Sequence, residues 1–329
     1  MSEFQKFMPF ENRLELTELQ TKMQQIKAEI KKVIVGQDNL IDLLLISMLA
    51  EGHSLIEGVP GIAKTITAKL LAKTLDASFS RIQFTPDLMP SDVTGTSVLN
   101  AKTNEFEFRR GPVFAHIVLI DEINRAPAKT QASLFECMSE RQVTADGSTY
   151  RLVAPFLVLA TQNPVEQEGT YRLPEAQLDR FLFKIDITYP SLEEEITIIK
   201  EQNARKNLDK ESLVNQVATG AEIVAFQQLV KQVYAHDQIM EYIAKVVDST
   251  RNNASLILGA SPRASIAILD SAKASAAIDG RDFITPEDVK KVTYPILSHR
   301  VMLAPEREME GWSAPKVIRQ IIDAVEIPR

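Results

Sequence analysis

The chain has 329 residues and a net charge of −7, with 45% hydrophobic and 25% charged residues. This acidic balance argues against binding to nucleic acid, and no run approaches the roughly eighteen apolar residues that a membrane-spanning helix needs. The single Cys137 cannot form an intrachain disulfide and the polar first residues lack the pattern of a secretion signal, so we expect a cytoplasmic protein that is not inserted into a membrane.

A glycine-rich turn over residues 58–65 lies between a short strand-like run, residues 54–56, and a helical pattern that begins near Ile66. Backbone N–H groups of such a turn and the positive end of the following helix bind phosphate. Lys64 and Thr65 stand where a phosphate loop has the lysine that reaches the β- and γ-phosphates and the hydroxyl that ligates Mg²⁺. The turn therefore predicts that the chain binds ATP with Mg²⁺.

Ala63 departs from the usual phosphate-loop pattern, which has glycine at this position. A residue that enters a helix is expected to have a negative φ, and a methyl group fits a backbone of that conformation. The substitution therefore weakens the match without removing it.

Two segments have the pattern of β-hairpins. Residues 97–110 include the alternating Phe106-Glu-Phe108, and residues 142–152 have strand-like arms around Asp146-Gly147, which is a strong signal for a tight turn. Both are predicted to be insertions in the domain that binds nucleotide.

The segment 116–122 is an apolar strand that ends in two adjacent carboxylates, Asp121 and Glu122. An unbroken apolar run is typical of a strand buried on both faces of a parallel sheet, and the carboxyl edge of such a sheet binds ligands. Asp121 is expected to hold Mg²⁺ directly or through water, and Glu122 to polarise the attacking water. Their position downstream of Lys64 favours this interpretation over a plain acidic turn.

A second strand of the buried type starts at residue 155 and ends at Asn163, before a proline. An amide can hydrogen-bond both the attacking water and a phosphate oxygen, so Asn163 suits a sensor of the γ-phosphate; a turn asparagine is the alternative. A short helix within residues 173–179 then leads to Arg180, just before the apolar run 181–187. This placement suggests an arginine finger.

In this order the motifs resemble those of AAA+ ATPases, and their amino-acid sequences are similar to those of the MoxR family. The segments that carry the resemblance are 35–37, 60–65, 87–95, 121–127, 140–144, 162–164, 173–181 and 259–264. The resemblance implies an α/β fold, with an AAA+ P-loop NTPase core, a parallel sheet flanked by helices, and an all-α lid domain. Ala63 is a familiar variation in this family.

The predicted domains are an N-terminal helical segment, 1–30, a nucleotide-binding α/β domain, 31–189, and a helical lid domain, 190–329. The boundary precedes a capping box in residues 191–194, after which the apolar spacing is helical. The predicted ATP-binding residues are Gly58, Val59, Pro60, Gly61, Ile62, Ala63, Lys64, Thr65 and Ile66, with Ile34, Val35 and Gly36 as an apolar adenine pocket or, alternatively, a plain loop.

The resemblance also assigns arginines. Arg263 matches the sensor-2 arginine of the family, whose guanidinium can take two phosphate oxygens and couple nucleotide state to the lid. Because the lid is displaced in the branch that has the two insertions, Arg263 reaches either its own nucleotide or that of a neighbour. Arg180 is expected to act in trans, with Arg125 and Arg172 as competing candidates.

The resemblance further implies a homo-oligomeric, hexameric ring in which the hairpins project toward the pore, a partner with a von Willebrand A domain, and a client that needs remodelling, assembly, or insertion of a cofactor or metal. The hairpins could instead be passive surface elaborations. The alternatives for function are a nucleic-acid motor, a magnesium-chelatase-like motor and an ATP-switched binding module. Asp146 at a hairpin turn argues against the first, and Glu122 with Arg180 argues against the last.

Overall fold

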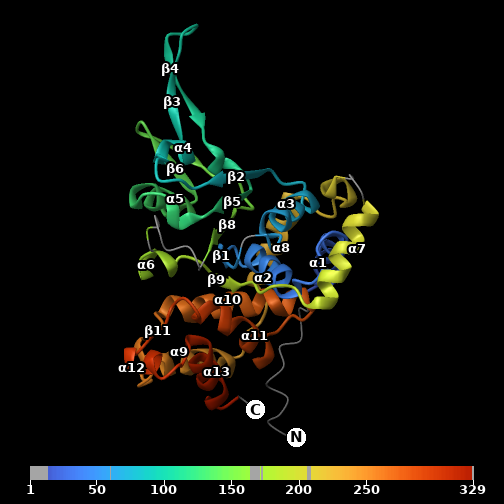
Figure 1. The fold of residues 1–329 in the computed structure, drawn as a ribbon, viewed down its shortest axis with the longest axis vertical. Helices are drawn as coiled ribbons and strands as arrows, with labels where there is room; N and C mark the ends of the chain where they lie inside the picture. Colours follow the sequence, from blue (N-terminus) through green and yellow to red (C-terminus); the bar gives the residue numbers. More distant parts are fainter. Residues whose placement is uncertain (1–13, 60, 164–170, 172, 206–208, 328–329) are drawn as a thin grey trace, which may run out of the picture.

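The computed structural model describes residues 14–59, 61–163, 171, 173–205 and 209–327. At its centre is a parallel sheet of five strands in the order β2-β5-β8-β1-β9. The strands are β1 (Ser54–Glu57), β2 (Phe79–Gln83), β5 (Ile117–Asp121), β8 (Leu157–Gln162) and β9 (Phe183–Asp186). The sheet and its flanking helices confirm the predicted α/β class (Figure 1).

Both faces of the sheet are covered, which explains why its central strands are apolar throughout. On one face, helices α1 (Thr17–Lys31), α2 (Asp38–Leu49) and α3 (Lys64–Thr74) share a buried cluster with strand residues such as Leu119. On the other face, α5 (Ala128–Glu140) shares a second cluster with residues such as Val118. Adjacent residues of one strand therefore serve different cores.

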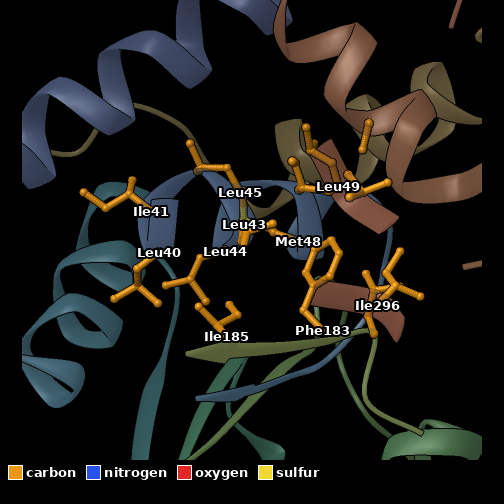
Figure 2. Close-up of a cluster of buried hydrophobic side chains, with 14 of the residues drawn as sticks. Leu40, Ile41, Leu43, Leu44, Leu45, Met48, Leu49, Phe183, Ile185 and Ile296 are labelled. Atoms are coloured by element: carbon orange, nitrogen blue, oxygen red, sulfur yellow. The ribbon is translucent and has the colours of Figure 1, made fainter. Parts of the chain in front are cut away.

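Helix α2 joins the nucleotide domain to the lid. Nine of its twelve residues are buried, as expected for a helix that is mostly apolar and has its two carboxylates, Asp38 and Asp42, on one side. Figure 2 shows its side chains around Met48 close to Phe183 and Ile185 of β9, with Ile296 of the lid beside Phe183. All of these side chains belong to one buried cluster, so the sheet, α2 and the lid share a continuous core.

The C-terminal part is helical, with one short antiparallel strand pair. Its elements are α7 (Leu192–Arg205), η4 (Lys210–Leu213), α8 (Gly220–Lys231), α9 (Asp237–Arg251), β10 (Leu256–Leu258), α10 (Pro262–Ile278), α11 (Pro286–Leu297), β11 (Met302–Leu303), α12 (Pro305–Met309) and α13 (Ala314–Ala324). The predicted capping box is present, because Ser191 N donates to Glu194 Oε2 and Glu194 N donates to Ser191 Oγ. Gln227 of α8 donates to the Met48 carbonyl, so α8 contacts the nucleotide domain through α2.

Both predicted hairpins are present. One consists of β3 (Gly95–Asn100) and β4 (Glu105–Arg110), and the other of β6 (Gln142–Ala145) and β7 (Ser148–Arg151). Asp146 and Gly147 have φ values of 49° and 76°, the left-handed pair that a tight hairpin turn requires. Figure 1 shows β3–β4 projecting from the end of the molecule opposite the lid.

The remaining short elements connect these parts. They are α4 (Pro90–Thr94), η2 (Pro112–Phe114), η3 (Ile123–Arg125) and α6 (Glu175–Leu178). Within the described ranges, no helix combines the length and the apolar character that crossing a membrane requires.

Candidate nucleotide-binding site

The predicted phosphate-binding and water-activating motifs meet at one edge of the sheet. Strands β1 and β8 are in register at their ends, where Glu57 lies opposite Gln162, and the N–H of Gly58 donates to the Gln162 carbonyl at 3.4 Å. Strand β5 ends at Asp121 on the same edge, next to β8. The turn that follows β1, the carboxylates that follow β5, and Asn163 after β8 are therefore brought together, as predicted.

The phosphate loop has a left-handed backbone at two positions. Gly61 has a φ of 87° and Ala63 a φ of 62°. The expected negative φ of Ala63 is wrong, because α3 begins only at Lys64 and Ala63 is its N-cap. The last residue of the turn adopts the left-handed conformation before the helix starts. For alanine this conformation is less stable than the right-handed helical one by roughly 1 kcal/mol. Pro60 lies outside the described residues.

The side chain of Lys64 reaches back to the first residue of the loop 58–65. Its Nζ donates to the carbonyl oxygen of Gly58 at 2.7 Å. Burial lowers the pKa of Lys64 below its ordinary value, while the nearby carboxylates of Asp121, Glu122 and Glu57 favour its charged form and act in the opposite direction. Lys64 therefore lies within the electrostatic field of the carboxylates at this edge of the sheet.

Asp121 is held by two residues that the sequence analysis missed. Arg81 of β2 lies with Nε 2.5 Å from Asp121 Oδ2. Thr161 of β8 donates from Oγ1 to Asp121 Oδ1 at 3.1 Å, and the same hydroxyl accepts the N–H of Glu122 at 3.1 Å. A polar side chain inside the otherwise apolar β8 was a signal that could have identified Thr161, whereas β2 mixes polar and apolar residues and gives no such signal for Arg81.

Glu122 and Arg125 form an ion pair within the chain. Glu122 has a φ of 57° and begins the short helix η3 as its N-cap. Its Oε2 lies 2.8 Å from Nε of Arg125. This competing candidate for the finger is therefore bound to the carboxylate of its own subunit, whereas the other, Arg172, lies outside the described residues.

Arg180 lies at the opposite edge of the sheet from Lys64. In the register of β1 and β9, Ser54 pairs with Phe183 and Glu57 with Asp186. Arg180 comes before β9 in the chain and so lies at the edge where β1 starts, whereas Lys64 comes after β1 and lies at the edge where β1 ends. Four strand residues separate the two edges, which is roughly 10 Å at 3.3 Å per residue. The Arg180 guanidinium donates to the Phe135 carbonyl of α5 at 3.1 Å and to Ser139 Oγ.

Arg263, at the start of α10, is close to the same turn. Its Nη1 lies 3.7 Å from Asp179 Oδ2, and Ser261 Oγ lies 3.4 Å from that oxygen. Arg263 is thus paired with the residue that precedes Arg180, on the side of the molecule away from the loop 58–65. The structure therefore places Arg263 beside the turn that contains Arg180, at the sheet edge opposite the loop 58–65.

The predicted adenine residues form a loop that contacts the strand-to-lid connection. Ile34 is buried and Val35 half-buried, and a Cβ on Gly36 would lie 2.3 Å from Glu194 Oε1. Gln37 Nε2 donates to the Thr188 carbonyl at 3.4 Å. A Cβ on Gly58 would lie 2.9 Å from the carbonyl oxygen of Ile187, the residue before Thr188. One connection therefore touches both the loop and the phosphate turn.

A cavity of about 680 Å³ lies between the sheet and the lid. Its walls include Glu57, Gln162 and Lys184 on the sheet side and Arg300 and Trp312 on the lid side. Among the described residues that line it, none belongs to the loop 58–65, so we do not assign this cavity to the phosphates.

Buried Cys137 and His53 have structural roles. Burial raises the pKa of Cys137 to about 12, which keeps the thiol protonated and unreactive. Burial lowers the pKa of His53 to about 4. His53 Nδ1 accepts the N–H of Val158 at 3.0 Å, so Nε2–H donates to the Met138 carbonyl at 3.1 Å. In the part of the chain that is described, no group of three or more His, Cys, Asp or Glu could hold a metal ion.

Comparisons with known proteins match both parts of the chain. A family model described as "ATPase family associated with various cellular activities (AAA)" matches residues 53–183, and one described as "AAA lid domain" matches residues 248–321. Chaperone MoxR1 of Mycobacterium tuberculosis is 42% identical over 310 residues, covering 92% of this chain and 81% of the relative. Protein MoxR of Methylorubrum extorquens is 30% identical over 347 residues, covering 95% and 97%.

Two further matches extend over nearly the whole chain. The uncharacterized protein YeaC of Bacillus subtilis is 48% identical over 299 residues, covering 91% of this chain and 92% of the relative. The crystal structure of a protein from Cytophaga hutchinsonii has a TM-score of 0.88 at 44% identity, covering 95% of this chain and 97% of that chain.

Proposed function

Since this chain belongs to the MoxR family of AAA+ ATPases, we propose that it hydrolyses ATP in a homo-oligomeric ring and uses the energy to remodel or assemble a client protein. The reaction is phosphoryl transfer to water. The observation that carries the proposal is the separation of Lys64 and Arg180 at opposite edges of one sheet, because Arg180 then lies away from a nucleotide that Lys64 of the same subunit holds.

The groups that bind the phosphates, the metal ion and the attacking water all come from one subunit. The N–H groups of the loop 58–65 and the ammonium of Lys64 bind the phosphates of ATP. The carboxylate of Asp121 and the hydroxyl of Thr65 are hard oxygen donors that fit Mg²⁺, and the ion when bound neutralises phosphate charge. Glu122 is the base toward the attacking water, and Asn163 orients that water against the γ-phosphate.

The arginine finger comes from a neighbouring subunit. Arg180 is exposed, and it is anchored at the surface by the Phe135 carbonyl. An arginine supplied in trans stabilises the charge of the transition state and is worth about 10³-fold or more in rate. We therefore expect a ring, hexameric by resemblance to the family, in which each nucleotide lies between the Lys64 of one copy and the Arg180 of the next.

The remodelling role is supported by the name of the Mycobacterium tuberculosis relative, Chaperone MoxR1. We propose that the client, and a partner with a von Willebrand A domain, contact the ring rather than the nucleotide. The β3–β4 hairpin suits such contacts because it projects from the end of the molecule opposite the lid (Figure 1), and Phe106 on β4 is an apolar side chain with 75% of its surface exposed.

The test is the dependence of activity on assembly. Specific ATPase activity should rise with protein concentration in parallel with ring formation measured by light scattering. Inactive Lys64→Ala subunits and inactive Arg180→Ala subunits should restore activity when mixed, because some interfaces then pair an intact Lys64 with an intact Arg180. If mixed rings form and no activity returns, Arg180 does not act in trans and the proposal is wrong.

A further inference from the structure

One buried arginine of the lid, Arg300, uses all five of its N–H groups. Nε donates to Asp179 Oδ1 at 2.7 Å; Nη1 donates to the carbonyls of Leu182 at 3.1 Å and Ile296 at 2.6 Å; Nη2 donates to the carbonyls of Asp179 at 3.1 Å and Phe181 at 2.7 Å. The side chain is only 3% exposed. A guanidinium has five such donors, so no donor is left for another partner.

Four of these five bonds end on the turn 179–182, which contains Arg180. The neighbouring His299 adds a fifth contact to the turn, because its Nε2 lies 3.0 Å from the Phe181 carbonyl. Burial, followed by the charge of Arg300, lowers the pKa of His299 well below its ordinary value, so the neutral ring donates through Nε2–H. The lid thus holds the backbone on both sides of Arg180.

The core side of the turn is fixed as well. The N–H of Leu182 donates to the His53 carbonyl at 2.7 Å, and the N–H of Arg180 donates to the Gln177 carbonyl at 3.1 Å. The Arg180 side chain itself points away from Arg300, to the Phe135 carbonyl of α5. The lid therefore contacts the turn through its backbone and through Asp179, and leaves the Arg180 guanidinium at the surface.

A gain in stability alone does not account for this arrangement. A buried ion pair adds little net stability compared with apolar side chains of the same volume, because both charges lose their hydration. What a guanidinium adds is direction, since its planar fork fixes several acceptors relative to one another. An arginine that must reach a phosphate in another subunit depends on such fixation, because a misplacement of 1 Å can cost about 100-fold in rate.

We propose that Arg300 is a positioning residue for Arg180, so that the lid of one subunit sets where its arginine meets the nucleotide of the next subunit. The inference rests on the proposed trans role of Arg180. Arg263 lies near the other carboxylate oxygen of Asp179. Two arginines of the lid therefore contact the turn through this one carboxylate.

The variant Arg300→Lys tests the proposal because it keeps the charge and removes the fork. ATP binding, measured by titration with a fluorescent ATP analogue, should stay within about twofold of the unsubstituted protein, because the phosphate loop is at the other edge of the sheet. The kcat of the ring should fall between about 10-fold and 100-fold. Arg307→Lys is the matched control, since this lid arginine pairs with Glu310 and does not touch the turn.

Mixing experiments separate positioning from a general structural defect. Arg300→Lys subunits should regain activity with Lys64→Ala subunits, which supply an intact Arg180 turn. They should not regain activity with Arg180→Ala subunits, because neither copy then offers a functional arginine. A subunit that is merely unstable would be rescued by neither partner, and that result would overturn the inference.

The outcomes distinguish this inference from the proposed function. If Lys64→Ala and Arg180→Ala subunits fail to restore each other, the trans role is wrong and the positioning role falls with it. If they restore each other but Arg300→Lys has normal kcat, only the positioning role is wrong. Should Arg300→Lys fail to fold, Asp179→Asn replaces it, because it keeps the shape and one acceptor oxygen while removing the charge that Arg300 faces.

Discussion

Arg81 Nε lies 2.5 Å from Asp121 Oδ2, so the carboxylate expected to ligate Mg²⁺ is paired with a cation of the neighbouring strand. The other oxygen of Asp121 accepts the Thr161 hydroxyl at 3.1 Å. The Asp121 side chain is 11% exposed and that of Arg81 is 52% exposed, so the pair can be opened from the arginine side. Arg81 and Mg²⁺ therefore compete for one oxygen.

Arg81→Gln should lower the Mg²⁺ concentration that gives half-maximal ATPase activity. A partly exposed ion pair contributes up to about 1 kcal/mol, which corresponds to about a fivefold change. The measurement is a Mg²⁺ titration at saturating ATP, with Arg81→Lys as the control that keeps the charge. An increased requirement for Mg²⁺ would show instead that Arg81 contributes to binding the phosphates.

Lys64→Ala and Glu122→Gln should have different defects. Loss of Lys64 removes the cation that the loop holds over the Gly58 carbonyl, so nucleotide binding should be abolished. Glu122→Gln keeps the size of the side chain and removes its basicity, so ATP should bind while hydrolysis stops. Fluorescent-nucleotide titration and steady-state phosphate release measure the two steps. Substantial turnover by Glu122→Gln would show that another group activates the water.

Removal of the tip of the β6–β7 hairpin should separate basal from stimulated activity. The two hairpins are joined, because Phe108 of β4 stacks on Tyr150 of β7 with ring centroids 4.2 Å apart, and Ser97 Oγ donates to Asp146 Oδ2. Deletion of residues 146–147 should leave basal ATPase nearly intact and remove stimulation by a partner or client.

The variant Tyr150→Ala gives the control for this deletion. It keeps the tip and removes a stacking contact worth about 1 kcal/mol, so it tests whether the hairpins must be held together. The ATPase rate with and without the partner is the measurement for both variants. Equal loss of basal activity in the deletion would mean that the hairpin mainly supports the ring or strand β8.

Asp288→Asn should destabilise the lid in a pH-dependent way. Burial alone would raise the pKa of Asp288, but hydrogen bonds from Arg281 and Thr285 outweigh it and lower the pKa below the ordinary 3.8. The carboxylate therefore stabilises the fold above about pH 4, and the contribution is lost as the pH falls through the folded-state pKa. We expect a cost of about 2–3 kcal/mol at pH 7.

Thermal unfolding at a series of pH values checks this prediction. The difference between the unsubstituted protein and Asp288→Asn should be largest near pH 7 and shrink below pH 4, where Asp288 begins to be protonated. Asp279→Asn is the matched control, because Asp279 pairs with the same Arg281 but is 50% exposed. A difference that does not change with pH would mean that the carboxylate charge is not what stabilises the lid.

The sequence by itself determined the features that are encoded within a few consecutive residues. The turn 58–65, the apolar strand before Asp121, the Asp146-Gly147 turn and the capping box at 191–194 were all predicted from local patterns, and the structure has each of them. Such features depend on backbone propensity and on contacts between near neighbours, and both can be read from spacing. Convergence at one sheet edge also followed, because parallel strands share a carboxyl edge.

Only the tertiary structure decided which distant side chains meet. Arg81 and Asp121 are 40 residues apart, and Arg300 and Asp179 are 121 apart. In the sequence both arginines resemble ordinary surface residues. Their partners depend on which strands are neighbours and on where the lid packs, and a local pattern does not contain that information. The left-handed backbone of Ala63 was missed for the same physical reason, because the closed shape of the loop, rather than the preference of alanine, sets its φ.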